Sequence, residues 1–421
     1  MNLDELTARL DDQLAGADAA FARQFPGDRG VRQPVHTVYV PAGSYAAGLA
    51  PDWGARALAV LDEHGSDAGS FARAVGLPEP VMEEVYPRVR AKLEREPIED
   101  LRIDFEDGYG QRPDDEEDAA AAAAVVALAD SLEGAAGAAR TAAPFHGIRF
   151  KSFDPATRRR GIRTLDLFVG GLARRGALRD GFRLTLPKVT SVEQAAAMVT
   201  ACEWLEQAHG LDRGRLAFEI QVETPQAVLG PDGTALVARM IRASQGRCIG
   251  LHYGTYDYSA STGIAGEYQS LEHPVADHAK AVMQVVAAGT GVHLSDGSTN
   301  ILPVGDGAGV RRGWALHARL VRRSLERGYY QGWDLHPAQL PTRFAATFAF
   351  YREGFASAAT RLGAYVGEGD STYLDEPATA LALASFVLRG VECGAVDDDE
   401  LLEVGLDRTA LARLARRGPT V

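Results

Sequence analysis

Eight short apolar segments recur along the chain, and helical patterns fill most of the gaps between them. The segments are rich in β-branched and aromatic residues, which is typical of buried strands. We place these strands at residues 36–41, 101–106, 148–153, 182–189, 216–223, 248–253, 291–295 and 330–335. Strands that alternate with helices predict a parallel sheet in an α/β protein. Eight such units predict a closed (β/α)8 TIM barrel.

Three stretches fall outside this alternation and have helical character. Residues 51–99 hold more than one helical pattern, and residues 116–143 are mostly alanine, the best helix former. The stretch 345–421 follows the last strand and is also helical in pattern. We therefore expect a barrel domain over residues 1–345, with N-terminal helical additions and an insertion at about 51–99. We expect residues 346–421 to form a C-terminal helical lid extension.

Charge and composition narrow the classes of function. The 421 residues include 44 Lys and Arg against 57 Asp and Glu, a net charge of −13, which argues against a nucleic-acid partner because such proteins present a basic face. No apolar run reaches the roughly 18 residues of a membrane span, which argues against a membrane partner. Cys202, Cys248 and Cys393 form no CxxC pair, and the acidic amphipathic start is unlike a signal peptide. These features predict a cytoplasmic protein.

Polar side chains follow nearly every predicted strand. In a TIM barrel the active site is built at the carboxyl ends of the strands, so these side chains are expected to gather around one site. A doubly wound open sheet would concentrate its chemistry at one switch point instead. No GxGxxG or GxxxxGKS/T pattern follows a strand, which argues against the nucleotide-binding folds.

Two carboxylates from neighbouring strands form the best candidate for a metal site. Glu223 ends the predicted fifth strand, and Asp257 follows the sixth. Oxygen ligands that leave room for water and substrate favour Mg²⁺ or Mn²⁺ over zinc. Pro225 and Gly254 put both acids on tight turns, which favours a site. The alternatives are a helix N-cap for Asp257 and a surface position for Glu223.

Arg149 lies within the predicted third strand, in GIRFKSF. A buried arginine needs a partner, and its planar fork suits a carboxylate or a carbonyl oxygen. The segment IDFEDGYG places Asp104 and Glu106 on one side of the second strand and Asp107 near its end. We expect these acids to position metal-bound waters or to pair with Arg149. The alternatives are a structural ion pair of Arg149 with Glu106 or Asp107, and a turn role for Asp107 with Gly108.

The substrate-binding set expected at the strand ends consists of Arg149, Lys188, Gly254, Thr255 and His336. His336 follows the eighth strand in GWDLHPAQL and is interpreted as a substrate-loop or packing residue. No Ser/Cys–His–Asp arrangement has a recognisable local context, so nothing supports covalent catalysis.

Several of these motifs together resemble a known group of enzymes. In chain order they are IDFEDGYG, GIRFKSF, LPKV, VETPQAVLG, GTYDYSASTG, GWDLHPAQL and STYLDEPATALA. Their types and order are similar to those of the citrate lyase β-subunit and malyl-CoA lyase group, within the HpcH/HpaI aldolase superfamily. The resemblance extends over roughly residues 36–390. Asp107 stands where the HpaI-type aldolases have histidine, which favours the lyase branch.

The resemblance implies a role for each matching residue. Glu223 and Asp257 would be the Mg²⁺ ligands. Arg149 would hold the carbonyl or carboxylate oxygen at the reacting carbon. Asp107 and Glu106 would support Arg149 and the waters on the metal.

A further implied residue lies near the C-terminus. Asp375 would match the lid aspartate of that group, which acts as an acid or base and enters the active site of a neighbouring subunit. The resemblance therefore implies a homo-oligomer, commonly a trimer or hexamer.

These roles predict a Mg²⁺-dependent carbon–carbon lyase or aldolase. It would cleave or form a small 3-hydroxy acid or its coenzyme A thioester through a metal-stabilised enolate. The segment TYDYS is also similar to one in malate synthase. The alternatives are therefore a malate-synthase-like acyl transferase or thioesterase on the same site, or a catalytically silent assembly subunit.

Overall fold

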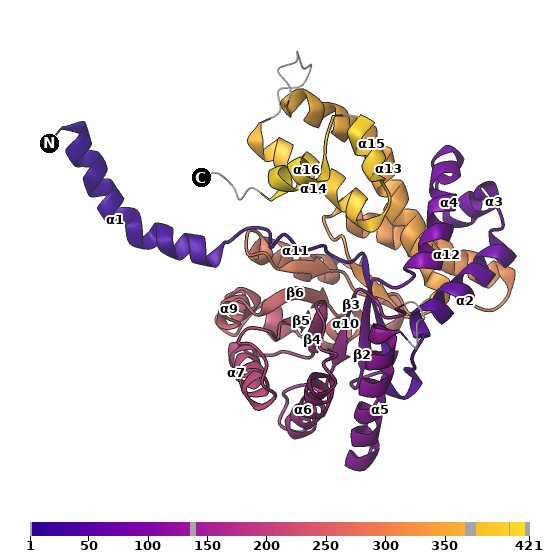
Figure 1. Ribbon diagram of the computed structural model, residues 1–421, viewed down its shortest axis with the longest axis horizontal. Helices are drawn as coiled ribbons and strands as arrows, with labels where there is room; N and C mark the ends of the chain where they lie inside the picture. Colours follow the sequence, from indigo (N-terminus) through magenta and orange to yellow (C-terminus); the bar gives the residue numbers. More distant parts are fainter. Residues whose placement is uncertain (1, 135–139, 367–375, 404, 417–421) are drawn as a thin grey trace.

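The computed structural model describes residues 2–134, 140–366, 376–403 and 405–416. Within these residues, eight parallel strands are joined in the order β7-β6-β5-β4-β3-β2-β1-β8 (Figure 1). A further parallel bridge between Ser295 and Gln331 joins β7 to the residue before β8 and closes the ring. The strands are β1 His36–Pro41, β2 Asp100–Asp104, β3 Phe145–Arg149, β4 Phe182–Leu186, β5 Phe218–Val222, β6 Cys248–Tyr253, β7 His293–Ser295 and β8 Gly332–Asp334. The predicted (β/α)8 barrel is confirmed.

Helices follow the strands and cover the outside of the barrel. The larger ones are α5 Asp114–Glu133, α6 Arg158–Arg174, α7 Val192–Ala208, α9 Leu236–Ala243, α11 Pro274–Ala287, α12 Gly307–Glu326 and α13 Leu340–Val366. Short elements lie at the strand ends: α8 Pro225–Val228, α10 Thr255–Ser261, η1 Ala42–Ser44, η2 Gly266–Tyr268 and η3 Pro337–Gln339. The alanine-rich stretch forms α5 as far as Glu133, and residues 135–139 lie outside the described part.

Alternation along the strands separates an apolar outer face from a polar inner one. On β2, Leu101 and Ile103 pack among the buried apolar side chains under the helices. Arg102 lies between them in sequence and faces the interior. There it donates a hydrogen bond of 2.7 Å to Glu219 on β5 and another to Asp100. Glu219 also lies 3.3 Å from Nε2 of His252. These buried charges are paired, as the low polarity of the interior requires.

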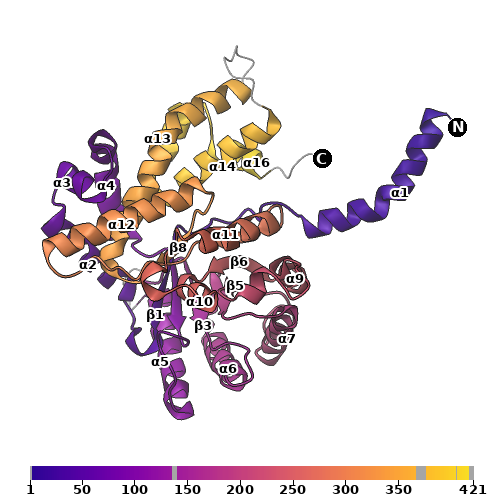
Figure 2. The same cartoon turned by 180° about the vertical axis from the view of Figure 1, so that it is seen from behind.

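The insertion between β1 and β2 consists of three helices. They are α2 Leu49–His64, α3 Ala68–Val75 and α4 Glu79–Arg95. Their apolar faces pack on α12 and α13 in a second core that includes Phe71 and Trp314. This insertion lies on one side of the barrel, away from α6 and α7 (Figures 1 and 2).

The C-terminal extension continues from α13 into α14 Pro377–Cys393, α15 Asp398–Glu403 and α16 Arg408–Ala415. It has its own apolar core. Arg389 on α14 donates a hydrogen bond of 2.7 Å to Gln33 and stacks 4.5 Å from the ring of Tyr330. Gln33 precedes β1 and Tyr330 precedes β8, so the extension lies at the amino ends of the strands.

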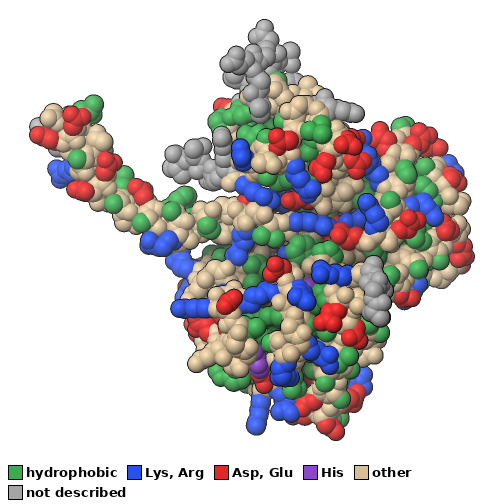
Figure 3. All heavy atoms as spheres, viewed as in Figure 1, with side chains coloured by type: hydrophobic (Ala, Val, Ile, Leu, Met, Phe, Trp, Pro, Cys, Tyr) green, Lys and Arg blue, Asp and Glu red, His purple; other side chains and the backbone are tan. Residues whose placement is uncertain are grey.

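The N-terminal helix α1, Leu3–Gln24, projects away from the rest of the molecule (Figures 1 and 2). Figure 3 shows hydrophobic and acidic side chains along this arm. Among the described residues, no helix combines the length and the hydropathy that crossing a membrane requires.

Glu219 connects Arg102 and His252 inside the barrel. Replacing Glu219 by Gln leaves Arg102 and His252 without their shared carboxylate, and breaking a buried ion pair costs roughly 3–5 kcal/mol. We expect Glu219→Gln to lower the free energy of unfolding by about this amount in urea denaturation. The control Glu203→Gln, in a surface ion pair on α7, should change it by less than about 0.5 kcal/mol. A loss under about 1 kcal/mol for Glu219→Gln would contradict the prediction.

Candidate active site

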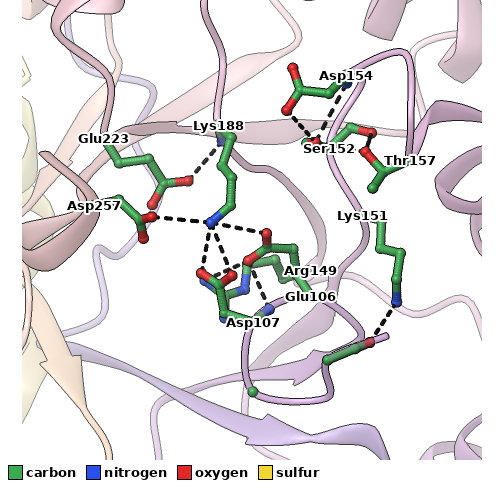
Figure 4. A network of polar contacts seen from close by, with 12 residues as sticks. Glu106, Asp107, Arg149, Lys151, Ser152, Asp154, Thr157, Lys188, Glu223 and Asp257 are labelled. Carbon is green, nitrogen blue, oxygen red and sulfur yellow. Dashed lines mark hydrogen bonds and ion pairs between the residues drawn. The ribbon is translucent and has the colours of Figure 1, made fainter. Parts of the chain in front are cut away.

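The carboxyl ends of five neighbouring strands bring most of the predicted site residues together (Figure 4). Because parallel strands end at the same rim of the barrel, residues far apart in sequence become neighbours. Glu106 and Asp107 follow β2, Arg149 ends β3, Lys188 follows β4, Glu223 follows β5 and Asp257 lies in α10 after β6.

Arg149 is held by Asp104, one of the three acids of the second strand that were expected near it. Its Nε and Nη2 donate to both carboxylate oxygens of Asp104, at 2.7 and 2.6 Å. Asp104 also accepts the backbone N–H groups of Glu106 and Gly108, at 2.9 and 2.8 Å. Arg149 therefore pairs with one of the three acids expected to pair with it, because the side chain of Asp104 lies beside it on the adjacent strand. Nη1 of Arg149 lies 3.6 Å from Oε2 of Glu106 and so is left at the rim.

Lys188 stands at the centre of the acidic residues. Its Nζ lies 2.9 Å from Asp107, 3.2 Å from Asp257 and 3.2 Å from Glu106 (Figure 4). Asp107 thus pairs with Lys188. The backbone of Lys188 has a φ of 51°, which is uncommon for a residue with a side chain. Such conformations concentrate at functional sites, where surrounding contacts hold them in place.

Glu223 is a buried carboxylate with one backbone hydrogen bond. Its Oε1 accepts the N–H of Lys188 at 2.7 Å. Burial and the neighbouring Asp257 raise the pKa of Glu223 to about 8. Gly254 makes this position available, because a Cβ there would lie 2.4 Å from Cβ of Glu223. Gly254, which was expected to bind substrate, therefore leaves room for the side chain of Glu223.

The pKa values of Glu106 and Asp107 are shifted in opposite directions. Burial raises the pKa of Glu106 to about 7, against the opposing effect of Arg149. The pKa of Asp107 is lowered despite its burial, because it is hydrogen-bonded to Glu106 and Lys188. Of the two carboxyl groups, Glu106 is therefore the one that titrates near neutral pH.

Three other predicted residues have different positions. Thr255 is buried and donates its hydroxyl to the carbonyl of Ser298 at 3.2 Å, which fastens the loop after β7. His336 accepts the N–H of Ala338 at 3.2 Å and caps η3. Asp375 lies outside the described residues.

The donor set fits a divalent cation that is held by few protein ligands. Asp257 is close enough to raise the pKa of Glu223, and a cation between them would relieve this repulsion. In the described part of the chain, no three Asp, Glu, His or Cys side chains converge as a preformed metal cage. A metal here would therefore depend on water or substrate for its other ligands, as Mg²⁺ commonly does.

The chain belongs to a family described as a domain of unknown function, DUF6986, which matches residues 14–418. No curated protein matches the chain.

Solved structures similar to the chain include malate synthase from Haloferax volcanii in complex with magnesium and glyoxylate. It has 16% identity and a TM-score of 0.49, and the match covers 93% of this chain and 99% of that one. The protein CitE from Mycobacterium tuberculosis, with magnesium, acetoacetate and coenzyme A, has 17% identity and a TM-score of 0.46, covering 87% and 99%. An HpcH/HpaI aldolase/citrate lyase family protein from Burkholderia cenocepacia has 16% identity and a TM-score of 0.39, covering 80% and 98%. The superfamily that the motifs resemble is thus represented among these structures, as predicted.

The raised pKa of Glu223 predicts an unusual effect of substitution on stability. The folded-state pKa of about 8 exceeds the ordinary 4.5, so the stability from the neutral form is complete below about pH 4.5 and is lost as the pH rises through 8. Without metal, Glu223→Gln removes the buried charge at nearly constant volume. We expect it to raise the melting temperature by at least about 2 °C at about pH 9 and to change it little at about pH 5.

The measurement is thermal unfolding with a chelator present at both pH values. Glu219→Gln, four residues earlier on β5, is the matched control, and it should lower the melting temperature at both pH values. A destabilised Glu223→Gln chain at about pH 9 would show that the carboxylate is stabilised by a charge partner instead.

Proposed function

We propose that this protein is a Mg²⁺-dependent carbon–carbon lyase or aldolase acting on a small 3-hydroxy acid or its coenzyme A thioester. Glu223 is the observation that carries the proposal. It is a buried carboxylate at the mouth of the barrel, beside Asp257, and its pKa is raised to about 8. A carboxylate in such a position destabilises the metal-free protein, which is typical of a functional site.

Glu223 and Asp257 would hold the cation, with Mn²⁺ as a substitute for Mg²⁺. When bound, the metal would polarise a substrate oxygen and stabilise negative charge on it. The two proposed metal ligands have different partners in the metal-free protein. The carboxylate of Asp257 lies 3.2 Å from the ammonium of Lys188, whereas the carboxylate of Glu223 accepts only a backbone N–H.

Arg149 would bind the oxygen at which negative charge develops. Asp104 occupies its Nε and Nη2, which fixes the plane of the guanidinium and leaves Nη1 at the rim near Glu106. A donor that is already oriented stabilises a developing oxyanion without reorganisation during the reaction.

Glu106 would move the proton. In the cleavage direction its ionised carboxylate removes the proton of the 3-hydroxyl group as the bond between C2 and C3 breaks. The hydroxyl carbon becomes a carbonyl, and the electron pair of the broken bond passes to the other fragment as an enolate, which is then protonated. A pKa of about 7 suits this exchange, because both protonation states are populated near neutral pH.

Asp375 would complete the site from a neighbouring molecule. The extension that follows it lies at the amino ends of the strands, whereas the acids lie at the carboxyl ends. A lid built on this extension would therefore reach the site of another subunit more readily than its own. This arrangement supports a homo-oligomer such as a trimer or hexamer.

A metal-binding experiment tests the proposal first. We expect Mn²⁺ titration, followed by electron paramagnetic resonance, to show one site in the wild-type chain and a loss of at least about tenfold in affinity for Glu223→Gln. Glu116→Gln, an exposed acid on α5, is the control and should bind like wild type. Equal affinity in all three chains would place the metal elsewhere.

Catalysis is then assayed with Mg²⁺ over a panel of 3-hydroxy acids and their thioesters, with release of a keto acid or aldehyde acid as the readout. A parallel assay with glyoxylate and acetyl-CoA detects acyl transfer instead. Cleavage that a chelator abolishes supports the lyase, whereas acyl transfer alone identifies the malate-synthase-like alternative.

Arg149 gives a separate prediction. Lysine carries its donors on a single nitrogen and lacks the planar fork, so it cannot bind both oxygens of Asp104 and the substrate in the same way. We expect Arg149→Lys to reduce kcat/KM by roughly 10²-fold or more. The control Arg163→Lys, in an exposed ion pair on α6, should leave kcat/KM unchanged. A loss below about threefold would assign Arg149 to a structural ion pair.

A further inference from the structure

Helix α1 is an arm whose surface is entirely accessible in the single chain. It extends over the 22 residues Leu3–Gln24, starts with a capping box between Asn2 and Glu5, and has no buried residue. A helix of this length measures about 33 Å. Both views show it leaving the barrel without folding back (Figures 1 and 2).

One face of the arm is apolar along its whole length. The residues on this face are Leu3, Leu6, Leu10, Leu14, Ala17, Phe21 and Phe25, the last of which caps the helix. Leu3 is 76% exposed and Leu14 is 49% exposed. Most helical stability in proteins comes from covering such a face, so the stripe requires a surface to pack on.

The spacing of the stripe indicates what kind of surface this is. The intervals are three, four and four residues, repeated twice, which corresponds to 11 residues in three turns. Two arms in a left-handed coiled coil would need intervals that average 3.5 residues. The arm is therefore suited to lie as a nearly straight helix on a groove.

The residues after the arm fix its direction. The N–H of Gly27 donates to the carbonyl of Gly289 at 2.8 Å. The guanidinium of Arg29 donates to the carbonyls of Gly246, Cys248 and Gly291, at 3.0, 2.8 and 3.0 Å. These carbonyls lie at the amino ends of β6 and β7, so the arm starts from a rigid root on the barrel.

A basic groove lies beside this root, between α14 and α16. Its volume is about 730 Å³. Its lining includes Leu388, Glu392, Arg408, Ala412, Arg413 and Arg416. Arg416 packs against Gly30 and lies 3.8 Å from Asp28. The groove therefore lies next to the C-terminal end of α1, where the arm joins the barrel.

The charges of the arm and the groove are complementary. Asp4, Asp11 and Asp18 follow each other at seven-residue intervals along one edge of the apolar stripe. The groove is lined by three arginines and one glutamate, in a chain whose net charge is −13. Arg416 pairs with Glu392 at 3.3 Å and Arg408 lies 3.7 Å from Asp398, whereas Arg413 is exposed. An acidic amphipathic helix is thus the ligand that this groove fits best.

We propose that α1 of one molecule docks in the arginine-lined groove of a second copy of this chain, and that the exchange is reciprocal. In each copy the arm leaves the barrel next to the groove. Two copies related by a twofold axis can therefore exchange arms, so that each arm occupies the groove of the other copy and no groove is left open. The proposal concerns assembly and does not depend on the reaction catalysed.

Sedimentation velocity of the full-length chain tests the proposal over a wide range of protein concentration. We expect Leu10→Asp with Leu14→Asp to halve the mass of the assembly, because two charges then lie within the docked stripe. Ala8→Asp with Ala19→Asp is the matched control, since it adds the same charges to the opposite face of α1 and should keep the wild-type mass. Neither pair touches the barrel, and circular dichroism melting checks that both variants are folded.

Charge reversal identifies the groove. Arg408→Glu with Arg413→Glu changes two exposed residues and should also halve the mass. Adding Asp11→Arg and Asp18→Arg to that chain should restore the wild-type mass, because both surfaces are then reversed.

Three results would overturn the proposal. One is a wild-type chain that sediments as a single copy at every concentration, in which case slow hydrogen exchange in α1 would identify docking on its own body. Another is an unchanged mass for Leu10→Asp with Leu14→Asp. The third is a failure of the reversed arm to rescue the reversed groove.

Discussion

The paired hydrogen bonds from Arg149 to Asp104 hold the mouth of the barrel together. They join β3 to β2 at the last residue of each strand, and the same carboxylate accepts the N–H groups of Glu106 and Gly108. One buried ion pair therefore orients the guanidinium, shapes the turn after β2 and places Glu106 beside both. The part of the site that follows β2 and β3 depends on this contact, and Lys188 reaches the same acids from the end of β4.

Below the rim, the barrel is polar inside and apolar outside. Arg102, Glu219 and His252 form a buried chain of charge across the interior, while the outward side chains of the same strands pack under the helices. Each charge in this column has a partner, which stabilises the ring without an apolar centre. Glu223 follows the same strand, four residues after Glu219, but its pKa is raised whereas that of Glu219 is lowered by Arg102 and His252.

The cations at the rim are distributed unevenly among the acids. Lys188 lies between Asp107 and Asp257, whereas Glu223 receives only the backbone N–H of Lys188. A metal held by Glu223 and Asp257 would therefore share Asp257 with an ammonium group. The affinity for the metal would depend on how far the side chain of Lys188 can move away from Asp257. The left-handed backbone of Lys188 sets the starting position of that side chain.

The sequence by itself determined the eight strands and the residues at their carboxyl ends. Strands β1 and β6 begin and end at the predicted residues, because the period-two pattern of a strand is local. Strand β3 was placed three residues late, since the buried Phe150 and Phe153 after it continue the apolar pattern. Only the tertiary structure selected Asp104 from three candidate acids as the partner of Arg149, put Lys188 among the acids, used His336 as a cap and set the extension at the amino ends. These features depend on strand register and on the direction of α13, which bring together residues that no local pattern relates.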